Sequence, residues 1–214
     1  MSSSLMGEVG FWPGTDSLVL FFASLAAMLV AKLVLEKVVF PAVALPPTAF
    51  KDGQLDPNLS FFTIHALANA VVCWLAFSDT IRLLAKPMAP YSESESVGHA
   101  VVMSVHIFHA LFYKLTKADI VHHAASVGLV GSIGWCVPWG GGLHAMDFFI
   151  CGLPGGVDYA MLAAAKAGLV RKITVKRVAK WLNIACRWPG ILLVINAMPV
   201  TPLCYTTQHR RDRI

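Results

Sequence analysis

The chain has 214 residues, of which 57% are hydrophobic and only 14% are charged, and its mean hydropathy is +0.65. Soluble domains carry about 25% charged residues, so this composition excludes an ordinary soluble fold and indicates a polytopic membrane protein. The formal net charge of +5 does not indicate nucleic-acid binding, because the basic residues are not interleaved with aromatic ones.

Apolar segments long enough to cross a bilayer recur along the chain. A spanning helix needs roughly 20 apolar residues. Six segments reach or approach that length: 17–45, 59–84, 97–113, 120–139, 143–169 and 179–205. We therefore expect an all-α transmembrane bundle of about six helices. The first sixteen residues contain Glu8 and Asp16 and no basic residue, so we expect insertion through the first helix rather than a cleaved signal.

Prolines and one pair of charged residues predict local features within three of these segments. Pro154, Pro189 and Pro199 lie inside the fifth and sixth apolar segments. Because proline removes a backbone donor and clashes with the preceding turn, these helices should be bent or broken. In the first segment Lys32 and Glu36 are four residues apart, a spacing that allows an ion pair on one helix face.

The basic residues gather mainly on one expected side of the membrane. The region between the fifth and sixth segments is the richest, and four of its residues are candidates for binding anionic lipid headgroups: Arg171, Lys172, Lys176 and Arg177. The five cysteines lie in apolar stretches without a CxxC spacing, so neither a disulfide framework nor a zinc site is expected.

Histidines at membrane depth are the strongest functional signal, since such groups are costly in a bilayer unless they are paired or used. Five of them lie in apolar segments: His65, His106, His109, His122 and His123. An acid–base or acyl-transfer site could use His122 and His123, with Asp119 on the same helix face as an orienting group. A b-type haem on His65 with His109 or His122 is another reading. Helix-bridging hydrogen bonds are the plain structural alternative.

The order of several motifs resembles the TRAM-LAG-CLN8 (TLC) domain family. The motifs are Phe62-Thr-Ile-His-Ala66, Val105-His-Ile-Phe-His-Ala110, Asp119-Ile-Val-His-His123, Gly152-Leu-Pro-Gly-Gly-Val-Asp-Tyr-Ala-Met-Leu162 and Asn183-Ile-Ala-Cys-Arg187. The third is similar to the family's most recognisable element, an acidic residue shortly before a paired histidine. The resemblance divides the chain into an N-terminal segment (1–16), a first transmembrane helix with its loop (17–58), a TLC-like domain (59–205) and a basic tail (206–214).

The resemblance implies a lipid-handling membrane protein, and the chain departs from it where catalysis is concerned. Residues 124–131 lack the acidic pair of the ceramide-synthase branch, and Cys151 or Gly152 stands where the family has glutamate. We therefore expect a protein that has diverged from catalysis and binds lipid. Its expected lipid-binding residues are His65, His109, His122, His123 and Asp158. An acyl-CoA-dependent acyltransferase using His122, His123 and Asp119 is the enzymatic alternative.

A third reading is an accessory structural subunit of a large respiratory or photosynthetic membrane complex, because the loops are short and no soluble domain is present. Under all three readings the expected partners are membrane lipids, with other subunits added under the third, and neither a metal nor a cofactor is required. The endoplasmic reticulum and the mitochondrial inner membrane are both compatible locations.

Overall fold

The computed structural model describes residues 15–86, 97–136 and 141–197. In these ranges the chain forms six helical segments, four of which carry internal π-helical turns. The first segment comprises α1 (Thr15–Val34), η1 (Leu35–Val39) and α2 (Phe40–Ala42), and a short 3-10 turn η2 (Pro47–Ala49) and hairpin β1 (Phe50–Lys51) and β2 (Gln54–Leu55) follow it. The second and third segments are α3 (Pro57–Ala85) and α4 (Val97–Phe112).

The remaining three segments are composite. The fourth consists of α5 (Lys117–His123), η3 (Ala124–Gly131) and α6 (Ser132–Cys136). The fifth consists of α7 (Gly141–Asp147), η4 (Phe148–Gly152) and α8 (Leu153–Lys166), and the sixth of α9 (Lys172–Leu182), η5 (Asn183–Arg187) and α10 (Trp188–Ala197). The predicted all-α architecture of about six helices is confirmed, and the sixth helix begins seven residues earlier than expected.

Not every helical segment is long and apolar enough to cross a membrane. Four described segments are: Asp16–Ala42, Pro57–Ala85, Gly141–Lys166 and Lys172–Ala197. Val97–Phe112 is apolar but shorter, and the segment beginning at α5 falls outside the four because polar residues, including Asp119, His122 and His123, dilute its first turns. The chain is thus an integral membrane protein, with four full-length candidate spans in the described ranges.

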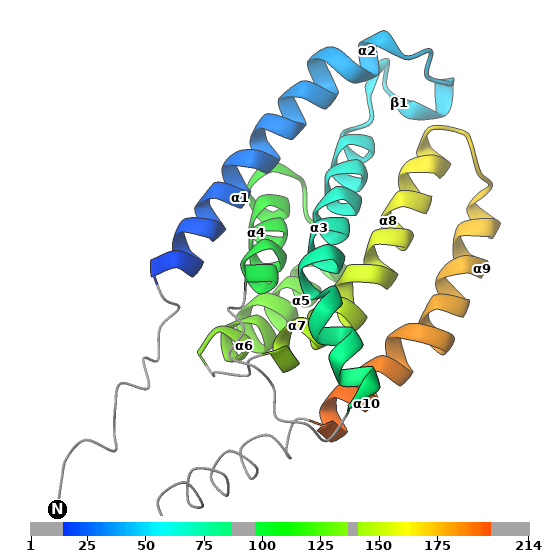
Figure 1. The fold of residues 1–214 in the computed structure, drawn as a ribbon. Helices are drawn as coiled ribbons and strands as arrows, with labels where there is room; N and C mark the ends of the chain where they lie inside the picture. The colour runs from blue at the N-terminus through cyan, green and yellow to red at the C-terminus, as the bar shows by residue number, and fades with distance from the viewer. Residues whose placement is uncertain (1–14, 87–96, 137–140, 198–214) are drawn as a thin grey trace, which may run out of the picture.

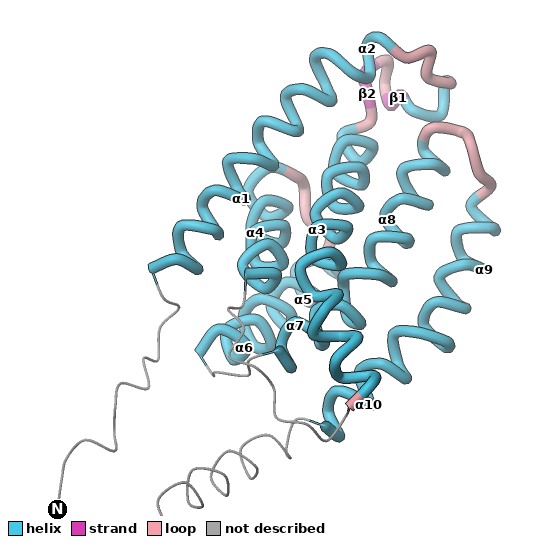
Figure 2. The backbone as a smooth tube through the Cα atoms, viewed as in Figure 1, coloured by secondary structure: helices cyan, strands magenta, loops and turns pink. Residues whose placement is uncertain are grey.

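Helix α3 forms the centre of the bundle. It packs against α4 and α7 as well as α8, and Figure 1 shows α1 and α4 on one side of it and α8 followed by α9 on the other. The apolar core lies where α1, α3 and α4 meet and includes Met28, Ile64, Val72 and Phe108. Figure 2 shows the hairpin and the α8–α9 loop at one end of a molecule that is otherwise mostly helical.

Three of the π-helical turns share one sequence cause. η1, η4 and η5 each end two residues before a proline, at Pro41, Pro154 and Pro189. In each case the residue just before the proline donates its N–H to a carbonyl five residues back, as Leu153 does to Phe148. Widening the turn makes room for the ring, which would otherwise clash with the carbonyl four residues earlier. The fifth and sixth segments are therefore widened at proline, where a bend or break was predicted.

One end of the bundle collects most of the basic residues. The ammonium group of Lys166 pairs with Asp56 at the start of α3, and the Thr48 hydroxyl donates to the Lys166 carbonyl at 3.2 Å. Nearby, Ser60 on α3 contacts Glu36 (2.6 Å) and Tyr113 (3.2 Å), and Glu36 pairs with Lys32 as predicted. These contacts bring the hairpin, the α4–α5 loop and the α8–α9 loop to the same end.

Candidate functional site: a histidine cluster between α3, α4 and α5

Helices α3, α4 and α5 bring the five predicted histidines together. His65 comes from α3, His106 and His109 from α4, and His122 and His123 from α5. The ring centroids of His106 lie 5.3 Å from both His122 and His123 and 6.1 Å from His65. His106 and His109 are one helical turn apart on α4, and His122 and His123 of α5 contact them one by one.

A directed set of hydrogen bonds links α4 to α5. Nδ1 of His106 lies 2.7 Å from the Val102 carbonyl, which only accepts, so His106 carries its hydrogen on Nδ1. Its Nε2 is then an acceptor, and the Nε2–H of His122 donates to it over 3.3 Å. This assignment leaves Nδ1 of His122 as a bare acceptor nitrogen. Ser126 lies beside it at 3.2 Å, but its hydroxyl makes a shorter hydrogen bond to the His122 carbonyl.

Aromatic rings stack on one member of the second histidine pair and on His65. Nδ1 of His109 lies 3.0 Å from Nε2 of His123, and the His109 ring stacks on Phe61 at 3.9 Å. On α3 the His65 ring stacks on Tyr159 of α8 at 3.6 Å. Tyr159 is therefore a member of the site that sequence reasoning missed, since nothing in its local pattern shows that α8 packs its ring on α3.

Unsatisfied polar atoms lie on the α3 side of the cluster. Nδ1 of His65 is buried and makes no hydrogen bond to any described residue, and the same holds for both amide atoms of Asn69, one turn further along α3. A buried polar atom without a partner costs free energy. We take these atoms as positions that a bound polar group would satisfy.

Exposure increases steadily across the cluster. His65, His106 and His109 are buried, His123 is half-buried, and His122 is exposed beside the exposed apolar side chains of Ile120 and Val121. The sequence identified His122 as a histidine at membrane depth, and the structure puts it at an outer edge of the bundle. The cluster is therefore reachable from the outside of the bundle, beside exposed apolar side chains.

Asp119 has a local structural role. Thr116 caps α5, and the Asp119 carboxylate accepts hydrogen bonds from the Thr116 N–H (2.8 Å) and hydroxyl (2.7 Å), which completes a capping box. The hydrogen bond from the Thr116 N–H is the main cause that lowers the pKa of Asp119 below its ordinary value. The Asp119 carboxylate was predicted to orient His123, and in the structure it caps α5.

Asp158 lies apart from the histidine contacts. Its carboxylate pairs with Arg187 at 3.4 Å, and Arg187 in turn donates to Asn183. Among the residues that the structure describes, no hydrogen bond or ion pair links Asp158 to a histidine. Of the expected lipid-binding set, the structure therefore brings together His65, His109, His122 and His123, adds His106, and leaves Asp158 with Arg187.

Two buried histidine–aspartate pairs lie nearer the opposite end of the bundle. Nδ1 of His99 lies 3.0 Å from Asp147, and its Nε2 lies 3.0 Å from the Gly131 carbonyl. Nδ1 of His144 lies 2.8 Å from Asp79, while the Gly98 N–H donates to its Nε2. These pairs join α3, α4, η3 and α7. Sequence reasoning missed them, because no spacing rule connects residues 48 and 65 positions apart.

The basic residues expected to hold anionic headgroups divide into two groups. Lys172 and Lys176 line a pocket of about 370 Å³ between α8 and α9, together with Lys166. Arg171 and Arg177 are exposed and are not among its lining residues. The pocket therefore selects two of the four predicted residues and adds a third lysine from α8.

In the described ranges no group of three or more histidine, cysteine or acidic side chains is placed to hold a metal ion. The haem alternative on His65, His109 and His122 stays a sequence prediction. No protein-family model, curated protein or solved structure matches the chain. The TLC resemblance thus rests on the motifs alone, and the function has to be argued from the site.

Proposed function

We propose that this integral membrane protein binds a hydroxyl-bearing lipid at the histidine cluster, with the lipid hydroxyl donating a hydrogen bond to Nδ1 of His122. The observation that carries the proposal is the hydrogen-bond direction from His122 to His106 to Val102. It leaves an acceptor nitrogen at the exposed edge of the cluster, beside a Ser126 hydroxyl whose shorter hydrogen bond goes to the His122 carbonyl.

The surroundings favour a lipid over a soluble ligand. His122 is flanked on α5 by exposed apolar side chains, so a molecule that reaches it from the bilayer keeps its hydrocarbon in an apolar environment. A hydroxyl in hydrocarbon gains by finding an acceptor, because the bilayer core offers it no water. The half-buried His123 lies next to His122, and the buried His65 extends the polar track inward.

Binding without turnover fits the local chemistry best. General-base catalysis by an imidazole is helped by a carboxylate that orients and charges it. Here His106 is oriented by a backbone carbonyl, and the Asp119 carboxylate is used in the cap of α5. The proposal therefore keeps the TLC-like, catalytically diverged reading and adds a specific ligand group.

Photo-crosslinking in phosphatidylcholine nanodiscs tests the proposal. The probes are a diacylglycerol with a diazirine in one chain and its methyl ether, which lacks only the donor hydrogen. Wild type should prefer the alcohol by about threefold to tenfold, the ratio given by one net hydrogen bond. His122→Leu should lose this preference, and the neighbouring control Val121→Leu should keep it. Equal labelling of wild type by both probes would overturn the proposal, and conversion of the probe on adding acyl-CoA would establish the acyltransferase alternative.

A further inference from the structure

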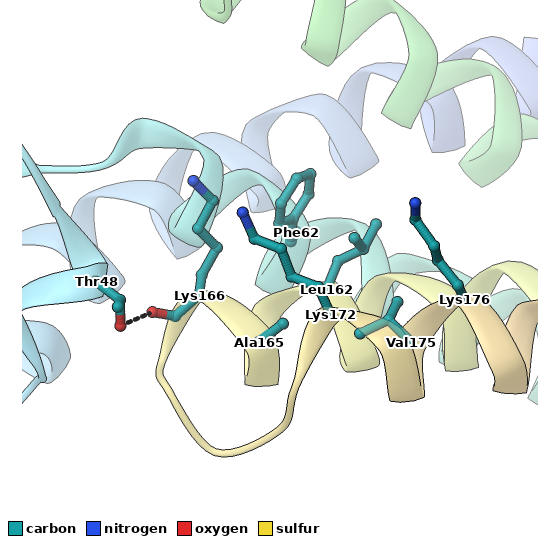
Figure 3. A pocket seen from close by; sticks show the side chains of 8 residues that line it. All are labelled: Thr48, Phe62, Leu162, Ala165, Lys166, Lys172, Val175 and Lys176. Atoms are coloured by element: carbon teal, nitrogen blue, oxygen red, sulfur yellow. Dashed lines mark hydrogen bonds between the residues drawn. The ribbon is translucent and has the colours of Figure 1, made fainter.

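A second candidate binding site lies at the basic end of the bundle, away from the histidines. The pocket of about 370 Å³ is formed by α3, α8, α9 and the turn at Thr48. Its floor is apolar and includes Phe62, Leu162 and Val175. Figure 3 shows the side chains of Lys166, Lys172 and Lys176 extending to the same side as the Phe62 ring. A volume of this size is within the range of ligand pockets, roughly 300–1,000 Å³.

The three lysines differ in how their charges are compensated. Lys166 pairs with Asp56. Burial by itself would raise the pKa of the Asp56 carboxyl, but the hydrogen bonds from Lys166 and the Asn58 N–H and the nearby charges of Lys166 and Lys51 lower it overall. The ion pair therefore fixes one wall of the pocket as a neutral unit.

Lys172 and Lys176 remain without an anionic partner among the described residues. They are four residues apart on α9 and so lie on the same helix face. The sequence contains no acidic residue from Tyr159 to Arg211, so α9 and the chain on either side of it supply no counter-ion. Two uncompensated ammonium groups over an apolar floor are complementary to an anion that carries a hydrocarbon chain.

The position of the pocket fits the bilayer interface. It lies where two candidate spans end and begin, at Lys166 and Lys172. Arg171, the residue that precedes α9, makes no side-chain capping hydrogen bond, so the positive end of the helix is also uncompensated. Headgroup phosphates lie at this depth, and the apolar floor runs from there toward the hydrocarbon.

We infer that this pocket binds one phosphate-bearing amphiphile, with the phosphate between Lys172 and Lys176 and the chain against Phe62, Leu162 and Val175. The inference does not rest on the function proposed for the histidine cluster. The inference gives the basic residues a defined binding pocket. The sequence alone indicated only a general attraction of these residues to anionic lipid.

Lipid retention measured by native mass spectrometry tests the site. The full-length protein is released from nanodiscs of phosphatidylcholine with a minor fraction of phosphatidic acid. The double variant Lys172→Gln/Lys176→Gln should lose phosphatidic acid enrichment by about 30-fold, since each charge contributes about fivefold. The matched control Arg171→Gln/Arg177→Gln removes the same charge from α9 and the residue before it, outside the pocket, and should lose much less. Equal losses in the two variants would mean diffuse attraction and would overturn the inference.

Two further arms test the apolar half of the site and the source of the phosphate. Ala165→Leu fills the pocket without changing its charge and should also lose enrichment, and retention at the wild-type level would contradict the placement of the chain. Glycerol 3-phosphate carries the phosphate without the chain and should not displace phosphatidic acid. Displacement would show a site for a soluble phosphate and would contradict the amphiphile. The same variants should keep the wild-type crosslinking preference for the diacylglycerol probe over its methyl ether at His122, which would show that the bundle is intact.

Discussion

Arg187 donates its Nε–H to the carbonyl of Ile150 at 3.0 Å, and Ile150 lies four residues before Pro154. In a regular helix that carbonyl would accept the N–H of residue 154, which proline lacks. A side chain of the sixth segment thus satisfies the backbone group that a proline frees in the fifth. The same guanidinium pairs with Asp158, which ties α8 to η5 a second time.

This relationship predicts a coupling between positions 154 and 187. Arg187→Met should destabilise the protein by about 1–3 kcal/mol, because it leaves the carbonyl and a half-buried carboxylate without partners. Pro154→Ala restores an N–H for Ile150, so Arg187→Met should cost less in that background. Thermal unfolding of the four proteins in one detergent measures the difference. Additive losses would show that the Arg187–Ile150 contact is incidental.

Gly190 permits the fifth and sixth segments to approach closely. A Cβ placed on Gly190 would lie 2.1 Å from the ring of Phe149, a ring that is buried in the core formed with α10. Gly190→Ala should therefore displace that ring and cost roughly 1–3 kcal/mol.

Gly128 supplies the matched control, because a Cβ there meets nothing within 4 Å. Gly128→Ala adds the same methyl group to a helical position and should be neutral or stabilising by up to about 1 kcal/mol. Melting temperatures of the two variants in the same detergent decide the matter. A Gly190→Ala protein as stable as Gly128→Ala would refute the close packing.

The capping box of α5 predicts a pH dependence. Because the folded-state pKa of Asp119 is lowered, its contribution is fully present above the unfolded pKa of about 3.9 and is lost as the pH falls through the folded value. Asp119→Asn should remove this acid-sensitive term and lower stability at neutral pH by about 1 kcal/mol. Unfolding followed between pH 7 and pH 3 should give a flatter curve for the variant. Parallel curves would contradict the assignment.

We predict that His99 and Asp147 stabilise the fold as a pair, because each group offsets the cost of burying the other. Both ring nitrogens of His99 face oxygens, the Asp147 carboxylate and the Gly131 carbonyl, so the pair holds two protons between its members. His99→Leu strands a buried carboxylate and should cost about 3–5 kcal/mol. His99→Leu with Asp147→Leu removes both groups and should cost markedly less. A double variant as unstable as the sum of the single variants would exclude this compensation.

The sequence predicted the helices well because their signal is local. Apolar length located all six segments, and the spacing of Lys32 and Glu36 predicted their ion pair. Four of the described segments are full-length candidate spans, since α4 is short and the polar first turns of α5 dilute the fourth segment. Pro154 and Pro189 were predicted to bend or break their helices, whereas the chain accommodates both with π-helical turns, as it does at Pro41, for which no prediction was made. Pro199 lies outside the described residues.

The site could be predicted only in part. Five histidines were identified by residue type and depth, but the tautomer of His106 depends on a backbone carbonyl and the exposure of His122 depends on how α5 packs. Tyr159 and Asn69 join the site through helix packing between distant segments, which periodicity does not report. Asp119 was predicted to be a partner of His123. Thr116, three residues before it, could have shown that the two residues form a capping box, which is where the carboxylate lies.

The most direct test of the central claim is ¹⁵N solid-state NMR of histidine-labelled protein in phosphatidylcholine bilayers, with His122→Leu to assign the signal. We expect His122 to carry hydrogen on Nε2 and a bare Nδ1. Adding diacylglycerol should shift the Nδ1 resonance of His122 toward the hydrogen-bonded range, and adding its methyl ether should not. An Nδ1 that already carries hydrogen, or one that responds equally to both lipids, would contradict the account.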